Sequence, residues 1–168
     1  QKRYFETLEK YSPECYGMLT DYYTLPRKVV CPEIEWTLEA PINIETLINK
    51  KDFLGSVPWA MFNLCHKFTT IKGNVIAASE RKCEGMKEGL YTYSINPQKA
   101  ITVNHTNVIM TKKIASKVPE ALRGQYFQST MASSDKELAT QKYGIYGLLD
   151  EYNSFYYAMR VTLDLLEV

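Results

Sequence analysis

The sequence is poor in the residues that build metal and nucleophile sites. It has only two histidines, His66 and His105, which lie in different segments without the i, i+4 spacing of a helical metal site. It also lacks C-x-x-C pairs, the serine motifs G-x-S-x-G and S-x-x-K, and a glycine-rich phosphate loop. We therefore expect no metal and no cofactor, and no motif names a reaction.

The sequence also lacks a large excess of positive or negative charge, and it lacks long apolar runs. The chain carries 20 basic and 19 acidic residues, a net charge of +1, without a basic block, so we expect no nucleic-acid binding. No run approaches the roughly 18 apolar residues of a membrane span. With 45% apolar and 23% charged residues, the composition predicts one globular domain over residues 1–168.

Four cysteines are present, and all lie in the first half of the chain. Cys15, Cys31, Cys65 and Cys83 allow two disulfides in three connectivities, or four reduced thiols buried in a core. Disulfides would indicate a protein that is secreted or on the cell surface, whereas reduced thiols would indicate the cytoplasm. Both interpretations stay open, and the four residues are disulfide candidates.

The first two thirds of the sequence alternate between helix and strand patterns. Residues 1–25 have helical spacing that is interrupted before Pro13, and residues 44–54 predict a short helix ended by Gly55 and Pro58. Turn residues separate six short strands. The strands are expected at residues 28–31, 33–39, 59–71, 74–80, 89–95 and 99–103.

After residue 104 the strand patterns end and helix patterns follow. The expected helices cover residues 106–118 up to Pro119, residues 136–144 with a Ser134/Glu137 capping box, and residues 143–168. Together these elements predict an α+β fold, in which a mostly antiparallel sheet from the middle third packs against the C-terminal helices.

The final helix carries an acidic pair, Asp150-Glu151, inside an apolar, aromatic-rich run. At 100° per residue, we expect one stripe to face the core: Leu148, Tyr152, Phe155, Met159, Thr162 and Leu166. The opposite stripe is expected in solvent and consists of Asp150, Asn153, Tyr157, Arg160, Asp164 and Glu167. Asp150 is thereby assigned to the solvated face.

Glu151 lies between Phe155 and a seam of small residues. The seam consists of Gly144, Gly147, Ser154 and Ala158. Small side chains let a second backbone come close, so we expect Glu151 to point toward a neighbouring element. A carboxylate is almost never fully buried without a partner. Glu151 is therefore a candidate site residue, unless it reaches solvent or pairs with a Lys or Arg.

The run G-L-L-D-E-Y-N-S-F-Y-Y resembles the glutamate-bearing helix of zinc metallopeptidases of the gluzincin type. In that family an H-E-x-x-H helix supplies two histidine ligands and a general-base glutamate, and a later helix supplies the third ligand, a glutamate. The resemblance covers residues 99–168 and implies a zincin-like fold with Glu151 at the ligand position. Lys112 and Ser116 stand at the two histidine positions and Lys113 at the glutamate position, so the resemblance implies a scaffold without its catalytic residues.

A lysine at this position repels Zn²⁺ instead of binding it. We expect Lys112 on the apolar side of its helix, and our hypothesis is that it forms an ion pair with Glu151 where the family holds zinc. Such a pair would fix how two helices pack, although its net stabilisation is near zero once desolvation is counted.

These observations predict a non-catalytic, metallopeptidase-like domain outside the cytoplasm with a binding or structural role. The binding residues that we expect are Lys112, Tyr146, Glu151 and Tyr152, and the partner would be a protein, a peptide or a glycan. The alternative is a peptidase or a glycan-active hydrolase whose active site the sequence does not reveal.

Overall fold

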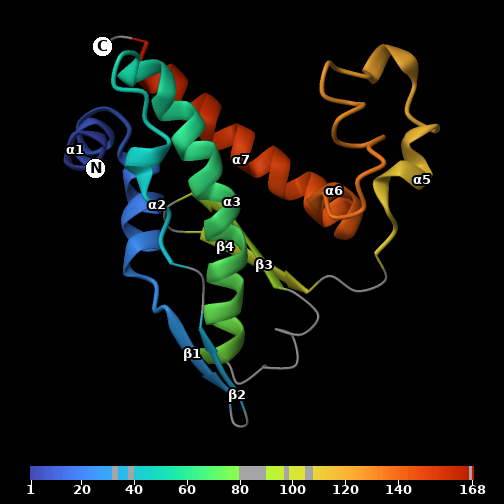
Figure 1. The fold of residues 1–168 in the computed structure, drawn as a ribbon, viewed down its shortest axis with the longest axis horizontal. Helices are drawn as coiled ribbons and strands as arrows, with labels where there is room; N and C mark the ends of the chain where they lie inside the picture. The colour runs from blue at the N-terminus through green and yellow to red at the C-terminus, as the bar shows by residue number, and fades with distance from the viewer. Residues whose placement is uncertain (32–33, 38–39, 80–89, 97–98, 105–107, 167) are drawn as a thin grey trace. The chain divides into compact units, whose positions relative to one another are not determined.

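The structure is a computed structural model (Figure 1) that describes residues 1–31, 34–37, 40–79, 90–96, 99–104, 108–166 and 168. The chain divides into two compact units. Unit 1 consists of Gln1–Asn104 and Asn153–Val168, and unit 2 of His105–Tyr152. The long helix α7, Ile145–Asp164, begins in unit 2 and ends in unit 1. The sequence predicts one domain over residues 1–168, and this division into two units does not test that prediction.

Unit 1 begins with two helices, as the sequence predicts. Helix α1 spans Lys2–Tyr11 and α2 spans Pro13–Thr24. Pro13 occupies the first turn of α2, where its missing N–H costs no hydrogen bond. The ion pair between Lys72 Nζ and Asp21 Oδ2, at 2.8 Å, joins α2 to the next long helix.

That helix, α3, spans Phe53–Ser79 and is 27 residues long. The strands predicted at residues 59–71 and 74–80 are therefore wrong, because residues 59–79 are helical. Residue 80 lies outside the described residues. The helix predicted at residues 44–54 is also wrong, because only a 3-10 turn, η1 (Ile44–Thr46), precedes α3. Asp52 Oδ1 accepts a hydrogen bond from Gly55 N at 3.1 Å, which is the pattern of a helix N-cap.

Two antiparallel hairpins complete unit 1. Strand β1 (Lys28–Cys31) pairs with β2 (Ile34–Thr37), and β3 (Leu90–Asn96) pairs with β4 (Lys99–Asn104). These strands confirm four of the six that were predicted, with residues 33, 38, 39 and 89 outside the described residues. The α+β class is therefore correct. The expected larger sheet is wrong, because each described sheet has two strands and helix takes the place of the other two.

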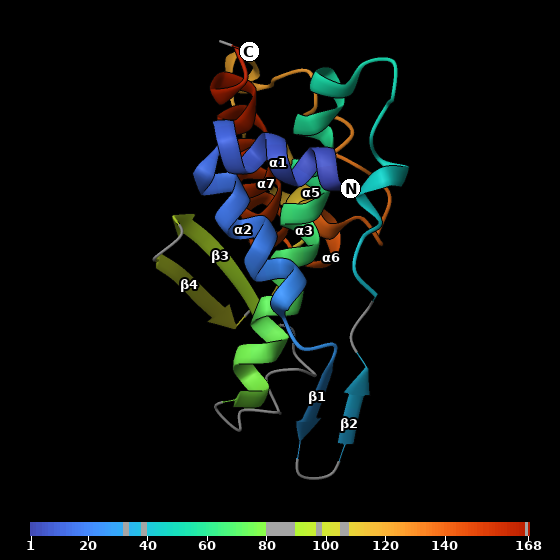
Figure 2. The same cartoon turned by 90° about the vertical axis from the view of Figure 1, so that its left-hand side faces the viewer.

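The core of unit 1 is formed mainly by helices. Figures 1 and 2 show α2, α3 and the C-terminal part of α7 side by side. The row that α3 buries has helical spacing: Val57, Ala60, Met61, Leu64, Cys65, Phe68 and Ile71. It packs with side chains of the other three helices: Tyr4, Leu8, Cys15, Met18, Leu19, Tyr22, Tyr157, Val161 and Leu165.

The rotation of α7 is the reverse of the sequence prediction. The residues that it buries are Asp150, Asn153, Ser154, Tyr157, Val161 and Leu165. Asp150 was assigned to solvent, yet it is only 4% exposed. The expected core residues Tyr152, Phe155, Met159 and Leu166 are exposed instead. The prediction was wrong because it assigned the side that carries Asp150 and Asn153 to solvent. That side also carries Tyr157, Val161 and Leu165, which lie in the core of unit 1.

Unit 2 contains short helices joined by turns. They are α5 (Thr111–Ala115), η2 (Glu120–Leu122) and α6 (Ala139–Lys142), followed by the start of α7. The helix predicted at residues 106–118 is thus reduced to one turn, with residues 106 and 107 outside the described residues. The capping box is wrong, since Glu137 N donates to Asp135 Oδ1 at 2.9 Å and the helix begins only after Leu138.

Two members of the small-residue seam bring backbone segments of unit 2 together. Gly144 has φ +57° and lies against the carbonyl oxygen of Ile109. Gly147 lies against the backbone of Ala139, so that a Cβ atom there would collide with that carbonyl group. The close backbone approach expected of this seam is confirmed at these two glycines.

We predict that Gly147→Ala destabilises the protein by about 1–3 kcal/mol, because the added methyl group overpacks a backbone contact. Helix propensity alone would give the opposite sign, a gain of roughly 1 kcal/mol. Gly124→Ala is the matched control, since nothing lies within 4 Å of a Cβ atom at that position. Denaturant unfolding of both variants measures the difference, and a stabilised Gly147→Ala variant contradicts the contact.

Candidate functional site

The four binding residues predicted from the sequence, Lys112, Tyr146, Glu151 and Tyr152, all lie in unit 2. Lys112 is exposed, and its Nζ donates to Ser134 Oγ at 2.7 Å. The exposure of Lys112 contradicts the expectation that it lies on the apolar side of its helix. Its pairing with Glu151 stays a hypothesis. Glu151 and Tyr146 are half-buried, and Tyr152 is 74% exposed.

Unit 2 is organised around a buried glutamine, Gln141, which no sequence pattern indicates. Gln141 Nε2 donates to Thr111 Oγ1 at 2.7 Å, and also to the carbonyl oxygens of Thr130 at 2.9 Å and Met131 at 3.2 Å. Its Oε1 accepts a hydrogen bond from Lys112 N at 3.0 Å. One side chain thereby ties α5, α6 and the intervening loop together. These contacts give Gln141 a structural role.

We predict that Gln141→Met loosens unit 2, because the part-buried N–H group of Lys112 then loses its acceptor at a cost of about 1–3 kcal/mol. The readout is hydrogen exchange of residues 108–142, which should accelerate in the variant. Gln128→Met is the control, because Gln128 is exposed. Unchanged exchange at Lys112 contradicts the role assigned to Gln141.

A polar junction holds the end of α7 in unit 1. Ser12 Oγ donates to Asp164 Oδ2 at 2.6 Å, and Arg160 Nε lies 3.2 Å from Asp164 Oδ1. Arg160 Nη1 lies 3.8 Å from Glu14 Oε2, and Tyr156 OH donates to Glu14 Oε1 at 3.4 Å. The hydrogen bond to Asp164 raises the pKa of Arg160. Partial burial, followed by the charge of Glu14, raises the pKa of Tyr156.

The described cysteines are buried in the same core. Cys15 is a free thiol whose Sγ lies 3.8 Å from the carbonyl oxygen of Tyr157. Burial raises its pKa from 9.0 to about 12. Cys65 Sγ accepts a hydrogen bond from Asn153 Nδ2 at 3.1 Å. Cys15 therefore forms no disulfide in the structure. The side chains of Cys31 and Cys83 lie outside the described residues, so the other predicted disulfides stay a prediction.

We predict that Cys15 resists alkylation in the folded protein. Only the thiolate reacts, and a pKa of about 12 in place of 9.0 lowers the thiolate fraction near neutral pH roughly a thousandfold. Because the folded state holds this proton more tightly, the associated stability is complete below pH 9.0 and is lost as pH rises toward 12.

Iodoacetamide labelling with peptide mapping, in native buffer and in guanidinium chloride, provides the measurement. Rapid labelling of Cys15 in the native protein, or its recovery in a disulfide-linked peptide, contradicts a buried free thiol. The same maps show whether the other three cysteines are reduced.

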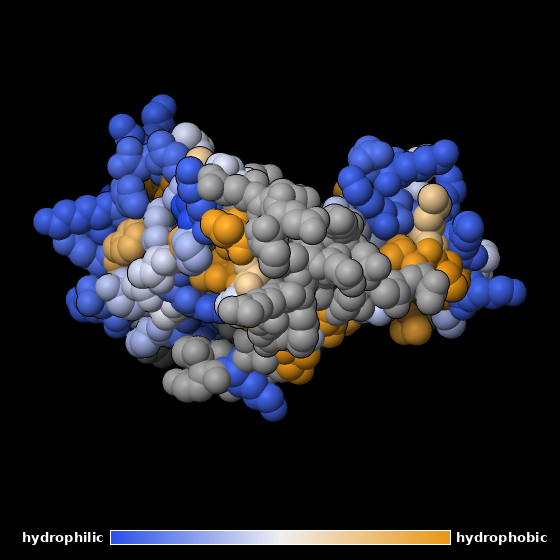
Figure 3. Space-filling model, turned by 90° about the horizontal axis from the view of Figure 1, so that it is seen from below, coloured by the Kyte–Doolittle hydropathy of each residue, from blue (hydrophilic) through white to orange (hydrophobic). Residues whose placement is uncertain are grey.

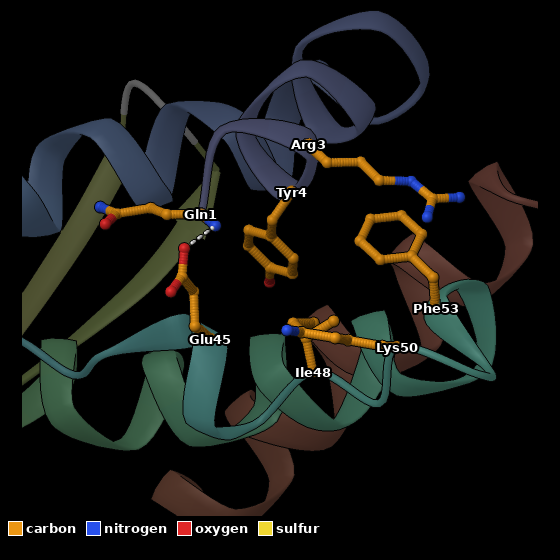
Figure 4. Close-up of a pocket in the computed structure, with 7 residues that line it drawn as sticks. All are labelled: Gln1, Arg3, Tyr4, Glu45, Ile48, Lys50 and Phe53. Carbon is orange, nitrogen blue, oxygen red and sulfur yellow. Dashed lines mark hydrogen bonds and ion pairs between the residues drawn. The ribbon is translucent and has the colours of Figure 1, made fainter.

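A cavity of about 380 Å³ opens where the start of α1 meets the loop before α3 (Figure 4). Its polar groups interact mainly with neighbouring protein groups. Glu45 Oε1 accepts from the Gln1 ammonium group at 2.7 Å, and the Arg3 guanidinium group lies 3.9 Å from the centroid of the Phe53 ring. Tyr4 OH donates to Met61 Sδ at 3.8 Å. The arrangement does not indicate a ligand class.

Large apolar side chains on α7 face solvent along one side. We call this surface the α7 outer face, and it consists of Trp59 of α3 with Phe155, Tyr156, Met159, Leu163 and Leu166. Each of these side chains is between 39% and 73% exposed. Hydrophobic side chains also reach the surface elsewhere, as Figure 3 shows for another view of the molecule.

Aromatic rings connect the two helices that form the α7 outer face. The rings of Trp59 and Phe62 are stacked with centroids 5.4 Å apart and an interplanar angle of 11°. Phe62 also contacts Phe155 of α7 at 4.9 Å, and His66 at 4.5 Å. This stack fixes the position of Trp59 beside α7. His66 therefore has an aromatic packing contact.

The α7 outer face was not predicted from the sequence, because the helical pattern assigned Phe155, Met159 and Leu166 to the core. One signal was present: Tyr156, Met159, Leu163 and Leu166 are spaced by three, four and three residues, as in a helix–helix seam. The spacing alone does not show that a different row of α7 is the one that packs in the core.

The described residues contain neither a cluster of metal ligands nor a helix that could span a membrane. No three His, Cys, Asp or Glu side chains in that part of the chain are grouped as metal ligands. None of the described helices is long and apolar enough to cross a membrane. In comparisons with known proteins, the chain matches no family model, no curated sequence and no solved structure.

Proposed function

We propose that this protein is a non-catalytic domain that binds another protein through the α7 outer face. The observation that carries the proposal is the exposure of six large apolar side chains on α3, on α7 and in the turn that follows α7. They present roughly 500–600 Å² of apolar surface when each is weighted by its exposed fraction. A patch at the upper end of the range seen on monomers is often functional.

The chemistry of the α7 outer face supports binding over catalysis. Its six side chains include no carboxylate, imidazole, thiol or amine. The hydroxyl group of Tyr156 donates a hydrogen bond to Glu14. Aromatic residues and methionine are the types enriched in the centres of protein interfaces.

The non-catalytic part of the proposal is supported by the resemblance of residues 99–168 to gluzincins. Lys112, Lys113 and Ser116 stand where that family has its two histidines and its glutamate. The helix α5 that carries the two lysines ends at Ala115, with Ser116 as its C-cap. A zincin-like origin and a location outside the cytoplasm remain parts of this proposal.

Trp59 provides a reporter for binding. The chain has two tryptophans, Trp36 and Trp59, so Trp36→Phe leaves Trp59 as the single emitter. Helical peptides selected from a displayed library on the immobilised protein should carry apolar residues at three- and four-residue spacing. Their binding should shift the Trp59 emission to shorter wavelength, because the exposed indole becomes covered.

Met159→Glu should weaken these peptides by about 30-fold or more, as loss of a central apolar contact does in other interfaces. Gln128→Glu adds the same charge at an exposed site of unit 2 and should leave binding unchanged. The proposal fails if no peptide is enriched, or if the selected peptides bind the Met159→Glu variant as well as the parent.

A further inference from the structure

The α7 outer face has the geometry of one half of a helix pair. Tyr156, Met159 and Leu163 of α7 have the three- and four-residue spacing with which a helix meets a second helix along a seam, and Leu166 continues the row in the turn after Asp164. All four are at least 40% exposed. Trp59 and Phe155 form an aromatic wall along one edge of this row. The surface therefore fits a helix that lies alongside α7.

The charge on this surface permits the chain to pair with itself. None of the six side chains is charged, so a second copy brings no like charges together. At the rim, Arg160 is neutralised by Asp164 and Glu14.

The available area also matches a self-contact. Two copies that each cover roughly 500–600 Å² bury about 1,000–1,200 Å² in total. That sum reaches the lower limit of about 1,000 Å² for a specific interface. A twofold contact uses the same patch on both partners, so one uncharged apolar row suffices for both sides.

From these observations we infer that a second copy of this chain docks on the α7 outer face to form a twofold dimer. The inference rests on the proposed function, that this face binds protein, and it names the partner. Met159 and Leu163 stand at the centre of the row, whereas Trp59 and Phe155 lie at its edge.

Sedimentation equilibrium of the full chain over about a hundredfold range of concentration provides the test. We expect the apparent mass to rise from 19.4 kDa toward twice that value. Trp59 emission in the Trp36→Phe background should shift to shorter wavelength along the same concentration curve. Met159→Glu and Leu163→Glu should each raise the dissociation constant about 30-fold or more, whereas Gln128→Glu should not.

Both outer-face variants replace exposed residues, so circular dichroism should show native helix content and separate lost pairing from lost folding. A wild-type chain that stays monomeric throughout overturns the second-copy inference. If it also binds selected peptides at Trp59, the proposed function stands and the partner is a different protein. A dimer that persists in both variants, or Trp59 burial only on phosphatidylcholine vesicles, also overturns the inference.

Discussion

The packing of one row of α7 into the helical core is the constraint on which unit 1 depends. Tyr157, Val161 and Leu165 follow one another at four-residue intervals and are all buried. Full burial of such side chains contributes about 1.5–3 kcal/mol each, more than a single exposed ion pair. Once this row is fixed, the rotation of α7 is fixed. Asp164 then meets Ser12, Asn153 meets Cys65, and the row that contains Met159 faces outward.

This rotation is also where interpretation of the sequence failed, for a physical reason. The helix has apolar residues on two opposite sides, and the polar residues Asn153, Arg160 and Asp164 marked one side as solvated. In the fold, Asn153 and Asp164 are paired with side chains from α3 and the α1–α2 junction. A polar group with a partner costs little to bury. The residue pattern of one helix cannot show which side chains of other helices will form hydrogen bonds with its polar residues.

Elements with local signals were predictable from the sequence. The break before Pro13, both hairpins, the existence of α7 and the close contacts of Gly144 and Gly147 follow from residues near each feature. Helix α3 was not predictable in this way, because Pro58 and a run of β-branched residues favour other structures locally. Burial of its apolar row in the core decides the outcome, and that depends on distant helices. The α7 outer face shares this dependence.

A helix with apolar rows on both sides removes each row from water only when something covers each side. Within the described part of unit 1, α1, α2 and α3 supply the core on one side, and the other row stays exposed. At about 25 cal/mol per Å², roughly 1,000 Å² buried by two copies corresponds to about 25 kcal/mol of transfer free energy. Association costs about 4–15 kcal/mol in lost translational and rotational freedom, and ordering side chains and leaving polar groups imperfectly paired cost more. Buried area therefore does not set the affinity, and the fit of the Met159–Leu163 row against its partner decides whether association is favourable. A contact of this kind is reversible and depends on concentration, in contrast to the row that closes the core.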